Sequence, residues 1–404
     1  MGECAFTMSD FFLCYINWST LLSSGFFEEK NNRMSSCLFL QKLIAAFSCT
    51  KRGINKSSKT AETMILPCYK KMTPPPTLWN LPDVVLGIIF NNVGIDYILT
   101  LRKVCRDIRN RIDDIKPEAH LLSVLIYVED CKISFQYCYT SNGKKWKMFG
   151  DDVEYEKDVE SGKNIVRCNG SVKIVNSDFP ELASRDFLLI LKFQRKCIEI
   201  FFSNRTENSN NFIQFLETLK SFLAIENKLL KVGEFNIHTD DQKSVIPALS
   251  LTDPQSIDSI EIFGSYSIQP VEFTEIMEME HWKTATSFES DYSFTGVSIQ
   301  NFRHFSKITV LFESISVEEL LEFKKIFQNS TKAVRFEIKY DGTFEDREQL
   351  LKKMGPAIMF NKGFRWYFRM STTDDDVLLI RLNNRIYFKR VPVAHVPKHA
   401  VIQN

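Results

Sequence analysis

Apolar residues recur at helical spacing in one compact stretch, residues 81–116. Val85, Leu86 and Ile89 fall on one face of a helix that opens near Pro82. Further apolar positions continue the period through one or two more helices: Ile98, Leu101, Val104, Cys105, Ile108 and Ile112. The pattern therefore predicts a small helical unit.

The next stretch, residues 121–176, alternates between apolar and polar side chains. Ile133, Phe135 and Tyr137 are each separated by one polar residue, which is the period of a half-buried strand. Residues 150–164 are charged and contain Gly162, so we expect a mobile loop there.

From about Asp178 the pattern switches repeatedly between helix and strand. Helices are predicted at 181–193, 210–223, 245–249, 273–282, 299–305, 317–327 and 344–354. Strands are predicted at 197–202, 233–238, 259–263, 285–289, 307–312 and 333–340. The strands recur at the spacing of roughly 20–30 residues that is typical of leucine-rich-repeat-like solenoids. We expect stacked strand–helix units with parallel strands, the strands on the concave side and the helices on the convex side.

Alternation within these strands divides their side chains between two faces. The following apolar residues should point into the core: Ile198, Ile200, Phe235, Ile237, Ile260, Ile262, Ile308, Val310, Val334, Phe336 and Ile338. Their neighbours should then be exposed: Glu199, Glu234, Asn236, His238, Glu261, Glu289, Lys307, Thr309, Arg335, Glu337 and Lys339. Acidic residues dominate the earlier strands and basic residues the later ones, which would suit a partner with two oppositely charged regions.

The remaining segments complete the expected organisation. Strands at 364–370, 377–382 and 386–391 form a predicted antiparallel meander that would cover the open end of the repeat. Before residue 72 no regular pattern emerges, Pro74-Pro75-Pro76 breaks any secondary structure, and Met72 is a candidate start of translation. We expect an α/β (α+β) chain with a weakly ordered extension 1–71, a helical unit 72–118, a β-rich connecting region 119–178, a repeat domain 179–391 and a tail 392–404.

Composition and charge narrow the function classes. The 404 residues include 51 Lys and Arg against 50 Asp and Glu, so no global field attracts nucleic acid or anionic lipid. Ten cysteines, none in a Cys-x-x-Cys pair, fit reduced thiols better than a disulfide framework. No apolar run reaches the length of about 18 residues that a membrane span needs. We therefore expect a protein of the cytoplasm, the nucleus or both, with neither nucleic acid nor membrane as a partner.

The helical unit resembles an F-box. The family's Leu-Pro, Ile-Phe, Leu and Val-Cys-Arg positions are present at the family's spacing: Leu81, Pro82, Ile89, Phe90, Leu99, Val104, Cys105 and Arg106. Two positions depart from the family. Ile108 stands where many F-boxes place an aromatic residue, and Gly87 interrupts the first helix, which costs about 1 kcal/mol of helix propensity.

Residues 72–391 as a whole resemble the nematode F-box proteins of the F-box A class, which carry an FTH domain. The resemblance rests on the order and spacing of short motifs, among them Asp113-Asp114-Ile115-Lys116-Pro117, Asp186-Phe187-Leu188-Leu189-Ile190-Leu191, His281-Trp282-Lys283-Thr284-Ala285, Asn301-Phe302-Arg303-His304-Phe305 and Val317-Glu318-Glu319-Leu320. It implies that a Skp-type adaptor, and through it a cullin–RING ubiquitin ligase, binds the F-box. It also implies that the FTH domain binds another protein, without saying which.

On this resemblance we expect the adaptor to bind Trp79, Leu81, Pro82, Ile89, Leu99, Val104 and Cys105. The same apolar residues have a second interpretation, as the core of a small helical unit. So short a segment cannot bury that many apolar groups in its own interior, and an exposed apolar surface usually marks an interface. The basic residues of the segment are expected on a solvated helix face: Arg102, Lys103, Arg106, Arg109 and Arg111.

A protein target is expected on the exposed strand face, at Glu234, Asn236, His238, Glu261, Lys307, Arg335 and Glu337. The alternative is a solvated sheet face without a binding role.

No constellation for catalysis, metal binding or cofactor binding emerges. His281 and His304 are expected to be structural, and the sequence has no Gly-x-Ser-x-Gly elbow, phosphate-cradling loop or dinucleotide fingerprint. We therefore expect no enzyme and no cofactor. Two functions remain: a receptor that brings its target to the ligase by proximity, or a scaffold that sequesters a partner without degrading it.

Overall fold

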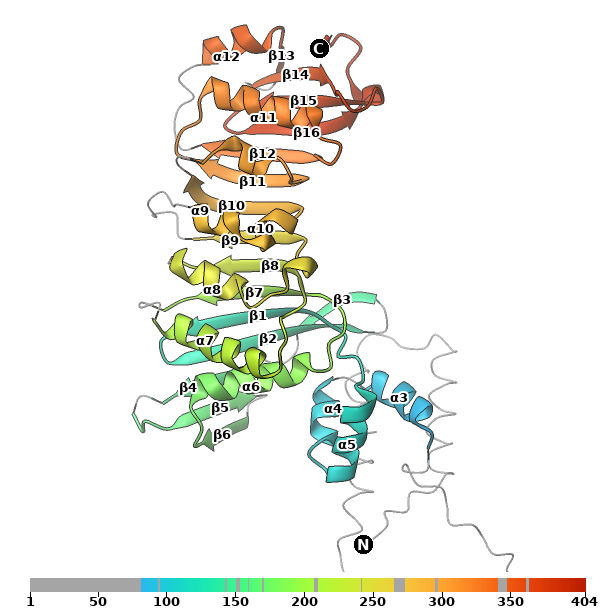
Figure 1. Cartoon of the computed structure of the whole chain (residues 1–404), viewed down its shortest axis with the longest axis vertical. Helices are drawn as coiled ribbons and strands as arrows, with labels where there is room; N and C mark the ends of the chain where they lie inside the picture. The colour runs from blue at the N-terminus through green and yellow to red at the C-terminus, as the bar shows by residue number, and fades with distance from the viewer. Residues whose placement is uncertain are drawn as a thin grey trace, which may run out of the picture. The chain divides into compact units, whose positions relative to one another are not determined.

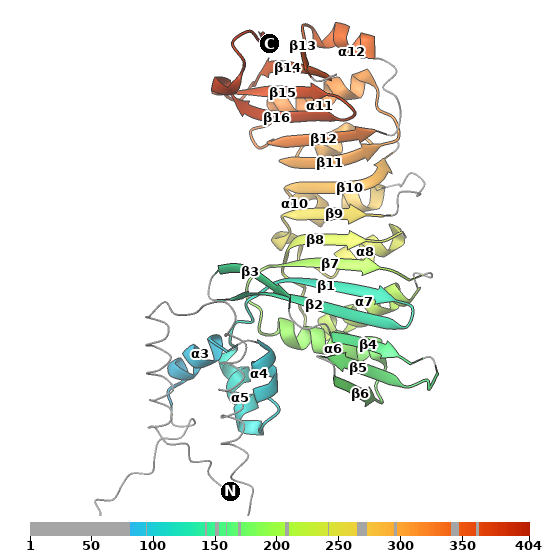
Figure 2. The same cartoon turned by 180° about the vertical axis from the view of Figure 1, so that it is seen from behind.

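The chain forms two compact units, Met1–Glu118 and Ala119–Asn404, and the computed structural model shows a small helical region followed by a large mixed sheet (Figures 1 and 2). It describes residues 81–93, 95–141, 144–149, 153–158, 160–168, 171–206, 210–240, 242–264, 273–294, 297–340, 347–360 and 363–404. The predictions for the extension 1–71, for Pro74-Pro75-Pro76 and for Trp79 lie outside the described residues.

The described part of the first unit is helical, which confirms the pattern of residues 81–116. Its helices are α3 (Asp83–Asn91), α4 (Ile95–Leu101) and α5 (Arg106–Ile115). Their buried apolar residues are Leu86, Phe90, Ile95, Ile98, Leu101, Ile108 and Ile112. Ile108, which replaces the aromatic residue of many F-boxes, is 1% exposed and so fills a core position.

Arg102 ties α4 to α5, and the prediction that it lies on a solvated face was wrong. Its Nε and Nη2 donate to the two carboxylate oxygens of Asp113, both at 2.9 Å, and its side chain is only 13% exposed. A bidentate charge-assisted pair of this kind fixes geometry as well as contributing energy. The sequence pattern missed it because Asp113 lies on a different helix, α5, whose position beside Arg102 is set by tertiary packing.

One mixed sheet runs through the second unit. Its first strands are β1 (Leu121–Glu129), β2 (Lys132–Ser141), β3 (Lys144–Phe149), β4 (Val153–Lys157), β5 (Asn164–Cys168) and β6 (Ser171–Val175). They are followed by β7 (Ile198–Asn204), β8 (Val232–His238), β9 (Ser259–Phe263), β10 (Ser287–Phe294), β11 (Lys307–Phe312) and β12 (Arg335–Tyr340). Strands β7 to β12 pair in parallel in chain order, and β1 pairs in parallel with β7. This confirms the predicted parallel pairing.

Antiparallel strands extend the sheet at both ends. At the N-terminal end β2, β4, β5 and β6 follow β1, so the region 119–178 contributes strands to the same sheet as β7. The C-terminal strands are β13 (Ile358–Phe360), β14 (Gly363–Arg369), β15 (Asp376–Leu382), β16 (Ile386–Pro392) and β17 (Ile402–Gln403). The predicted meander is confirmed in β14–β15–β16, and β16 covers the edge of β12.

The expected loop at 150–164 was wrong in part, because β4 occupies Val153–Lys157. Tyr155 of β4 points into the core, where its hydroxyl lies 3.0 Å from Asp186. The charged neighbours Glu154 and Glu156 point the other way and pair with cations on adjacent strands. A highly charged segment is therefore a stable strand, because cross-strand ion pairs neutralise its outer face.

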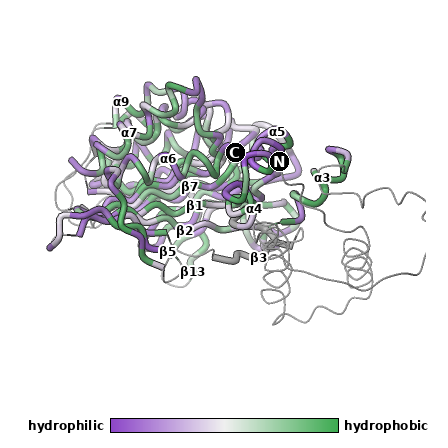
Figure 3. Tube along the Cα trace, turned by 90° about the horizontal axis from the view of Figure 1, so that it is seen from below, coloured by the Kyte–Doolittle hydropathy of each residue, from purple (hydrophilic) through white to green (hydrophobic). Residues whose placement is uncertain are grey.

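Helices cover one face of the sheet. They are α6 (Phe179–Leu191), α7 (Asn210–Ile225), α8 (Val245–Leu249), α9 (Thr274–Glu278), α10 (Glu280–Thr284), α11 (Val317–Asn329) and α12 (Arg347–Met354), with short 3-10 turns η3 (Gln242–Ser244), η4 (Pro254–Ser256), η5 (Ile299–Phe302) and η6 (Val393–His395). Figure 3 shows α6, α7 and α9 layered on one side of β7, β1 and β2. The opposite side of β7–β12, which faces the viewer in Figure 2, is hereafter the open face. The single helix predicted at 273–282 is instead α9 and α10, divided at Met279, whose backbone is extended (ψ 145°).

Aromatic side chains fill the space between sheet and helices. Phe288 of β10 lies 4.6 Å from Trp282 of α10 and 5.8 Å from Phe305, ring centre to ring centre. Phe323 of α11 packs 6.3 Å from Phe336 of β12. The high phenylalanine content, 34 residues, is thereby explained by a core built from large aromatic groups.

The alternation of the parallel strands places most side chains as predicted, with three corrections. Val334 was expected in the core but is 46% exposed, because β12 begins one residue later at Arg335. Asn236 and Glu337 were expected to be exposed, yet they are 5% and 4% exposed. Both lie on the open face, and their neighbours on adjacent strands cover them: Phe201 and Glu261 flank Asn236, while Thr309 and Tyr387 flank Glu337.

Candidate functional site

The first candidate surface is the apolar outer side of the F-box-like unit. Of the predicted adaptor residues, Leu81, Ile89 and Leu99 are half-buried. The others within the described part, Pro82, Val104 and Cys105, are exposed. The structure thus leaves each of these predicted residues at least partly accessible.

Two apolar residues on this surface were missed by the sequence reasoning. Val84 is 75% exposed and Ile88 is 54% exposed. They lie four positions apart on α3 and so share a face, opposite the buried pair Leu86 and Phe90. The sequence of α3 contains the signal that predicts them, because a helix that is apolar on all sides needs a packing partner on each side.

The second candidate surface is the open face of the sheet, where side chains align in rows across strands. In one row, Glu199, Glu234, Ser259, Ser287, Lys307 and Arg335 lie side by side. In the next row, two residues further along each strand, the order is Phe201, Asn236, Glu261, Glu289, Thr309 and Glu337. The predicted target residues therefore share one surface, with carboxylates over β7–β10 and cations over β11–β12. His238, half-buried, lies at the end of β8.

The carboxylates over β7–β10 repel one another in the isolated chain. Burial, and then repulsion from Glu289, Glu234 and Glu199, raises the pKa of Glu261 from 4.5 to about 7. Glu289, Glu234 and Glu199 are therefore close enough to act on the charge of Glu261.

Over β11–β12, the carboxylate of Glu337 neutralises part of the positive charge within the chain itself. Glu337 accepts hydrogen bonds from Arg335 Nη2 at 2.5 Å and from Arg385 Nη1 at 2.7 Å. Burial alone would raise the pKa of Glu337, but the hydrogen bonds from Arg385 and Arg335 outweigh it and hold that pKa below its usual range. A pocket of about 270 Å³ opens here, and its lining includes Glu289, Lys307, Lys339 and the two arginines.

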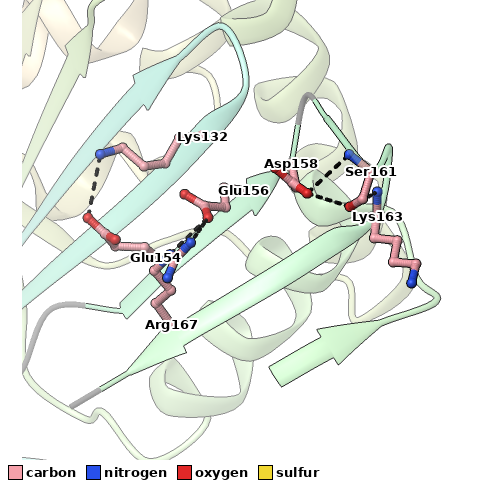
Figure 4. Close-up of polar contacts among 7 residues, drawn as sticks. All are labelled: Lys132, Glu154, Glu156, Asp158, Ser161, Lys163 and Arg167. Atoms are coloured by element: carbon pink, nitrogen blue, oxygen red, sulfur yellow. Dashed lines mark hydrogen bonds and ion pairs between the residues drawn. The ribbon is translucent and has the colours of Figure 1, made fainter. Parts of the chain in front are cut away.

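Ion pairs also neutralise charges on the N-terminal strands of the sheet, beyond the open face, as Figure 4 shows. Lys132 of β2 lies 3.4 Å from Glu154 of β4, and Arg167 of β5 lies 2.6 Å from Glu156. These pairs account for the charges of β4 without any external partner.

On the helix side, a cleft of about 860 Å³ lies along η5 and α11. Its charged lining residues are Arg303, Lys325, Lys332 and Glu322. His304 at its edge bonds the carbonyl of Trp282 through Nε2 at 2.7 Å, and burial lowers its pKa. This histidine therefore has a structural role, as expected. His281 also bonds a carbonyl, that of Thr252, at 2.9 Å.

Within the described residues, no group of three or more His, Cys, Asp and Glu side chains could hold a metal ion. No helix in that part of the chain is long and apolar enough to cross a membrane.

Comparison with known families finds one domain match in each unit. An F-box domain model matches residues 78–119, and an FTH domain model matches residues 213–353. The chain carries an F-box and an FTH domain. It is similar to F-box A protein 224 of Caenorhabditis elegans, with 23% identity over 273 residues, which is 65% of this chain and 67% of that protein. No solved structure matches the chain.

An F-box implies a substrate adaptor that binds a Skp-type protein within a cullin–RING ligase. Receptors that combine an F-box with an FTH domain are generally non-enzymatic. The F-box match contains the whole apolar surface around α3, and the FTH match contains β8–β12 with most of the charged rows.

Proposed function

We propose that this chain is the substrate-recognition subunit of a Skp–cullin–F-box E3 ubiquitin ligase. The F-box binds the Skp-type adaptor, and the FTH domain holds a protein target. The chain itself performs no chemistry and needs no cofactor. It raises the effective concentration of a target lysine near a charged ubiquitin-conjugating enzyme, in the cytoplasm, the nucleus or both.

The observation that carries the proposal is the apolar outer face of α3. Val84 and Ile88 expose most of their side chains to water, and contiguous exposed apolar surface usually marks a binding site. Together with Leu81, Pro82, Ile89, Leu99, Val104 and Cys105 they form the proposed adaptor surface.

The target surface is proposed to be the open face of a leucine-rich-repeat-like solenoid that spans 179–391. Parallel strand–helix units repeated from β7 to β12 support this description. The proposed contact residues are Glu234, Asn236, His238, Glu261, Lys307 and Arg335, with Glu337 as the buried residue that orients Arg335.

The test is copurification of the adaptor with a Val84→Asp, Ile88→Asp double variant. Interface hot spots typically cost about 2 kcal/mol or more on removal, so two charges on this face should abolish adaptor binding. Folding should be preserved because exposed positions usually change stability by less than about 0.5 kcal/mol. Val172→Asp is the matched control, since Val172 is 55% exposed but lies on β6.

Undiminished adaptor binding by the folded double variant would refute the proposed surface. Copurification of a cullin with the wild-type chain separates the ligase receptor from the scaffold alternative, which requires no cullin.

A further inference from the structure

Four glutamates occupy four consecutive parallel strands on the open face. They form what is hereafter the acidic patch: Glu199 of β7, Glu234 of β8, Glu261 of β9 and Glu289 of β10. Glu199 lies beside Glu234, and Glu261 lies beside Glu289, in two neighbouring rows. Adjacent strands are about 4.8 Å apart, so the acidic patch is about 14 Å long.

The acidic patch lacks the ion pairs that neutralise the carboxylates on the strands to either side of it. At the N-terminal end Lys132 and Arg167 neutralise the carboxylates of β4 (Figure 4), and at the C-terminal end two arginines neutralise Glu337. Within the described part of the chain, no cation lies within ion-pair distance of any carboxylate of the acidic patch. Burial first, and then repulsion from the three like charges beside it, destabilises the charged form of Glu261 and raises its pKa.

A neighbouring amide points to a ligand independently of these charges. Asn236 of β8 is 95% buried on the open face, directly beside Glu261. Its Oδ1 has no hydrogen-bond donor among the described residues. A buried acceptor without a donor is rare in folded proteins and calls for a specific explanation. This acceptor belongs to a side chain that lies directly beside Glu261 of the acidic patch.

We propose that the acidic patch binds a basic segment of the protein target, through lysine or arginine side chains. This inference deepens the proposed function and rests on it, because it takes the open face as the target-binding surface.

The chemistry fits an organic cation. Lysine and arginine carry several N–H donors on one positive group, so one side chain can pair with a carboxylate and, where the side chains that cover Asn236 shift on binding, also donate to Asn236 Oδ1. Charge-assisted hydrogen bonds of this kind are about twice as strong as neutral ones. Side chains two residues apart in an extended segment are about 6.6 Å apart on one face, so a few alternating basic residues suffice to follow the acidic patch.

The experiment is a titration of the full chain with a labelled peptide of about ten residues in which Ser and Lys alternate, followed by fluorescence anisotropy. The same peptide with Glu in place of Lys is the charge control. We expect binding of the Lys peptide only, weakened by salt because exposed charges are screened. Glu261→Gln and Glu234→Gln should each lower the affinity about tenfold.

The matched control variant is Glu217→Gln, because Glu217 is an exposed carboxylate of α7 on the helix side. It should bind the Lys peptide as the wild type does. Equal binding of the Glu and Lys peptides, or unchanged affinity in the Glu234→Gln, Glu261→Gln double variant, would overturn the inference. Adaptor copurification is measured on the same preparations. If the adaptor does not copurify with the wild-type chain, the proposed function is refuted, whereas the peptide result stands by itself.

Discussion

Glu337 is a buried carboxylate on the open face, and it pairs with Arg335 and Arg385. The alternation of β12 puts it on the open face, and the sequence therefore predicts an exposed, changeable side chain. Its neighbours on adjacent strands and two arginines instead enclose it, at 4% exposed. The alternation along a strand predicts on which face a side chain lies. It does not predict how far the side chains on adjacent strands cover it, so the burial of Glu337 could not be predicted from the sequence.

Replacement of Glu337 by Gln should lower the free energy of unfolding by about 1–3 kcal/mol, since hydrogen bonds to charged groups contribute on that scale. The amide cannot pair with both Arg335 and Arg385. Urea unfolding at neutral pH measures the loss. Thr309→Ser, a half-buried neighbour in the same row, is the mild control. A Glu337→Gln variant as stable as the wild type would show that the two arginines find equivalent partners.

Glu261 should make stability depend on pH in the opposite direction from an ordinary paired carboxylate. The folded chain raises the pKa of this carboxyl from 4.5 to about 7, so the folded state binds the proton more tightly than the unfolded state. The stabilisation is fully present below pH 4.5 and is lost as pH rises through about 7. Allowing for solvent screening, the loss is about 1–2 kcal/mol.

Glu261→Gln removes this ionisation. The charged groups that act on Glu261 are the carboxylates of Glu289, Glu234 and Glu199. The variant should be more stable than the wild type by about 1–2 kcal/mol at pH 8 and equal to it at pH 4. Urea unfolding at both pH values tests this. A variant that is less stable at pH 8 would mean that the carboxylate is stabilised rather than strained.

At the scale of elements, periodicity predicts the type of most helices and strands. It fails where contacts with residues distant in the sequence determine the local structure. The charges of β4 predict a solvent-exposed loop, yet Lys132 and Arg167 on neighbouring strands pair with its carboxylates. The break between α9 and α10 falls at Met279, with no proline or glycine to signal it. The exposed face of α3 was predictable in principle, since Val84 and Ile88 are visible in the sequence.

Gly87 is an element-scale test within α3. A Cβ at this position would lie 3.6 Å from Ile115 Cγ2, an ordinary contact distance. Gly87→Ala should therefore stabilise the F-box by about 1 kcal/mol through helix propensity, measured by thermal unfolding. Gly363→Ala is the contrasting control in β14: its Cβ would lie 2.5 Å from the carbonyl oxygen of Leu382, so it should destabilise. A destabilising Gly87→Ala would show that α3 and α5 tolerate no further atom.

At the scale of the whole molecule, the order of the helical unit and the repeat domain could be predicted from the sequence, because each has its own spacing of apolar residues. Helical spacing marks residues 81–116, and the alternation of helix and strand marks the repeat. What the sequence could not show is that β1 and β2 of the region 119–178 join the sheet beside β7. That pairing joins residues about 75 positions apart, and local periodicity carries no information about such partners.

This pairing leads to a prediction for the second unit as a separate protein. Because β1 and β2 form the N-terminal flank of β7, residues 119–404 should fold alone and unfold thermally as they do within the full chain. A fragment starting at residue 179 lacks β1 and leaves the apolar side chains Ile198, Ile200 and Phe202 of β7 beside an unpaired edge, so it should aggregate or unfold at lower temperature. Calorimetry and size-exclusion chromatography of the two fragments test this. If the 179–404 fragment proves as stable as 119–404, strands β1–β6 are an addition to a self-sufficient repeat and β7 is its true first strand.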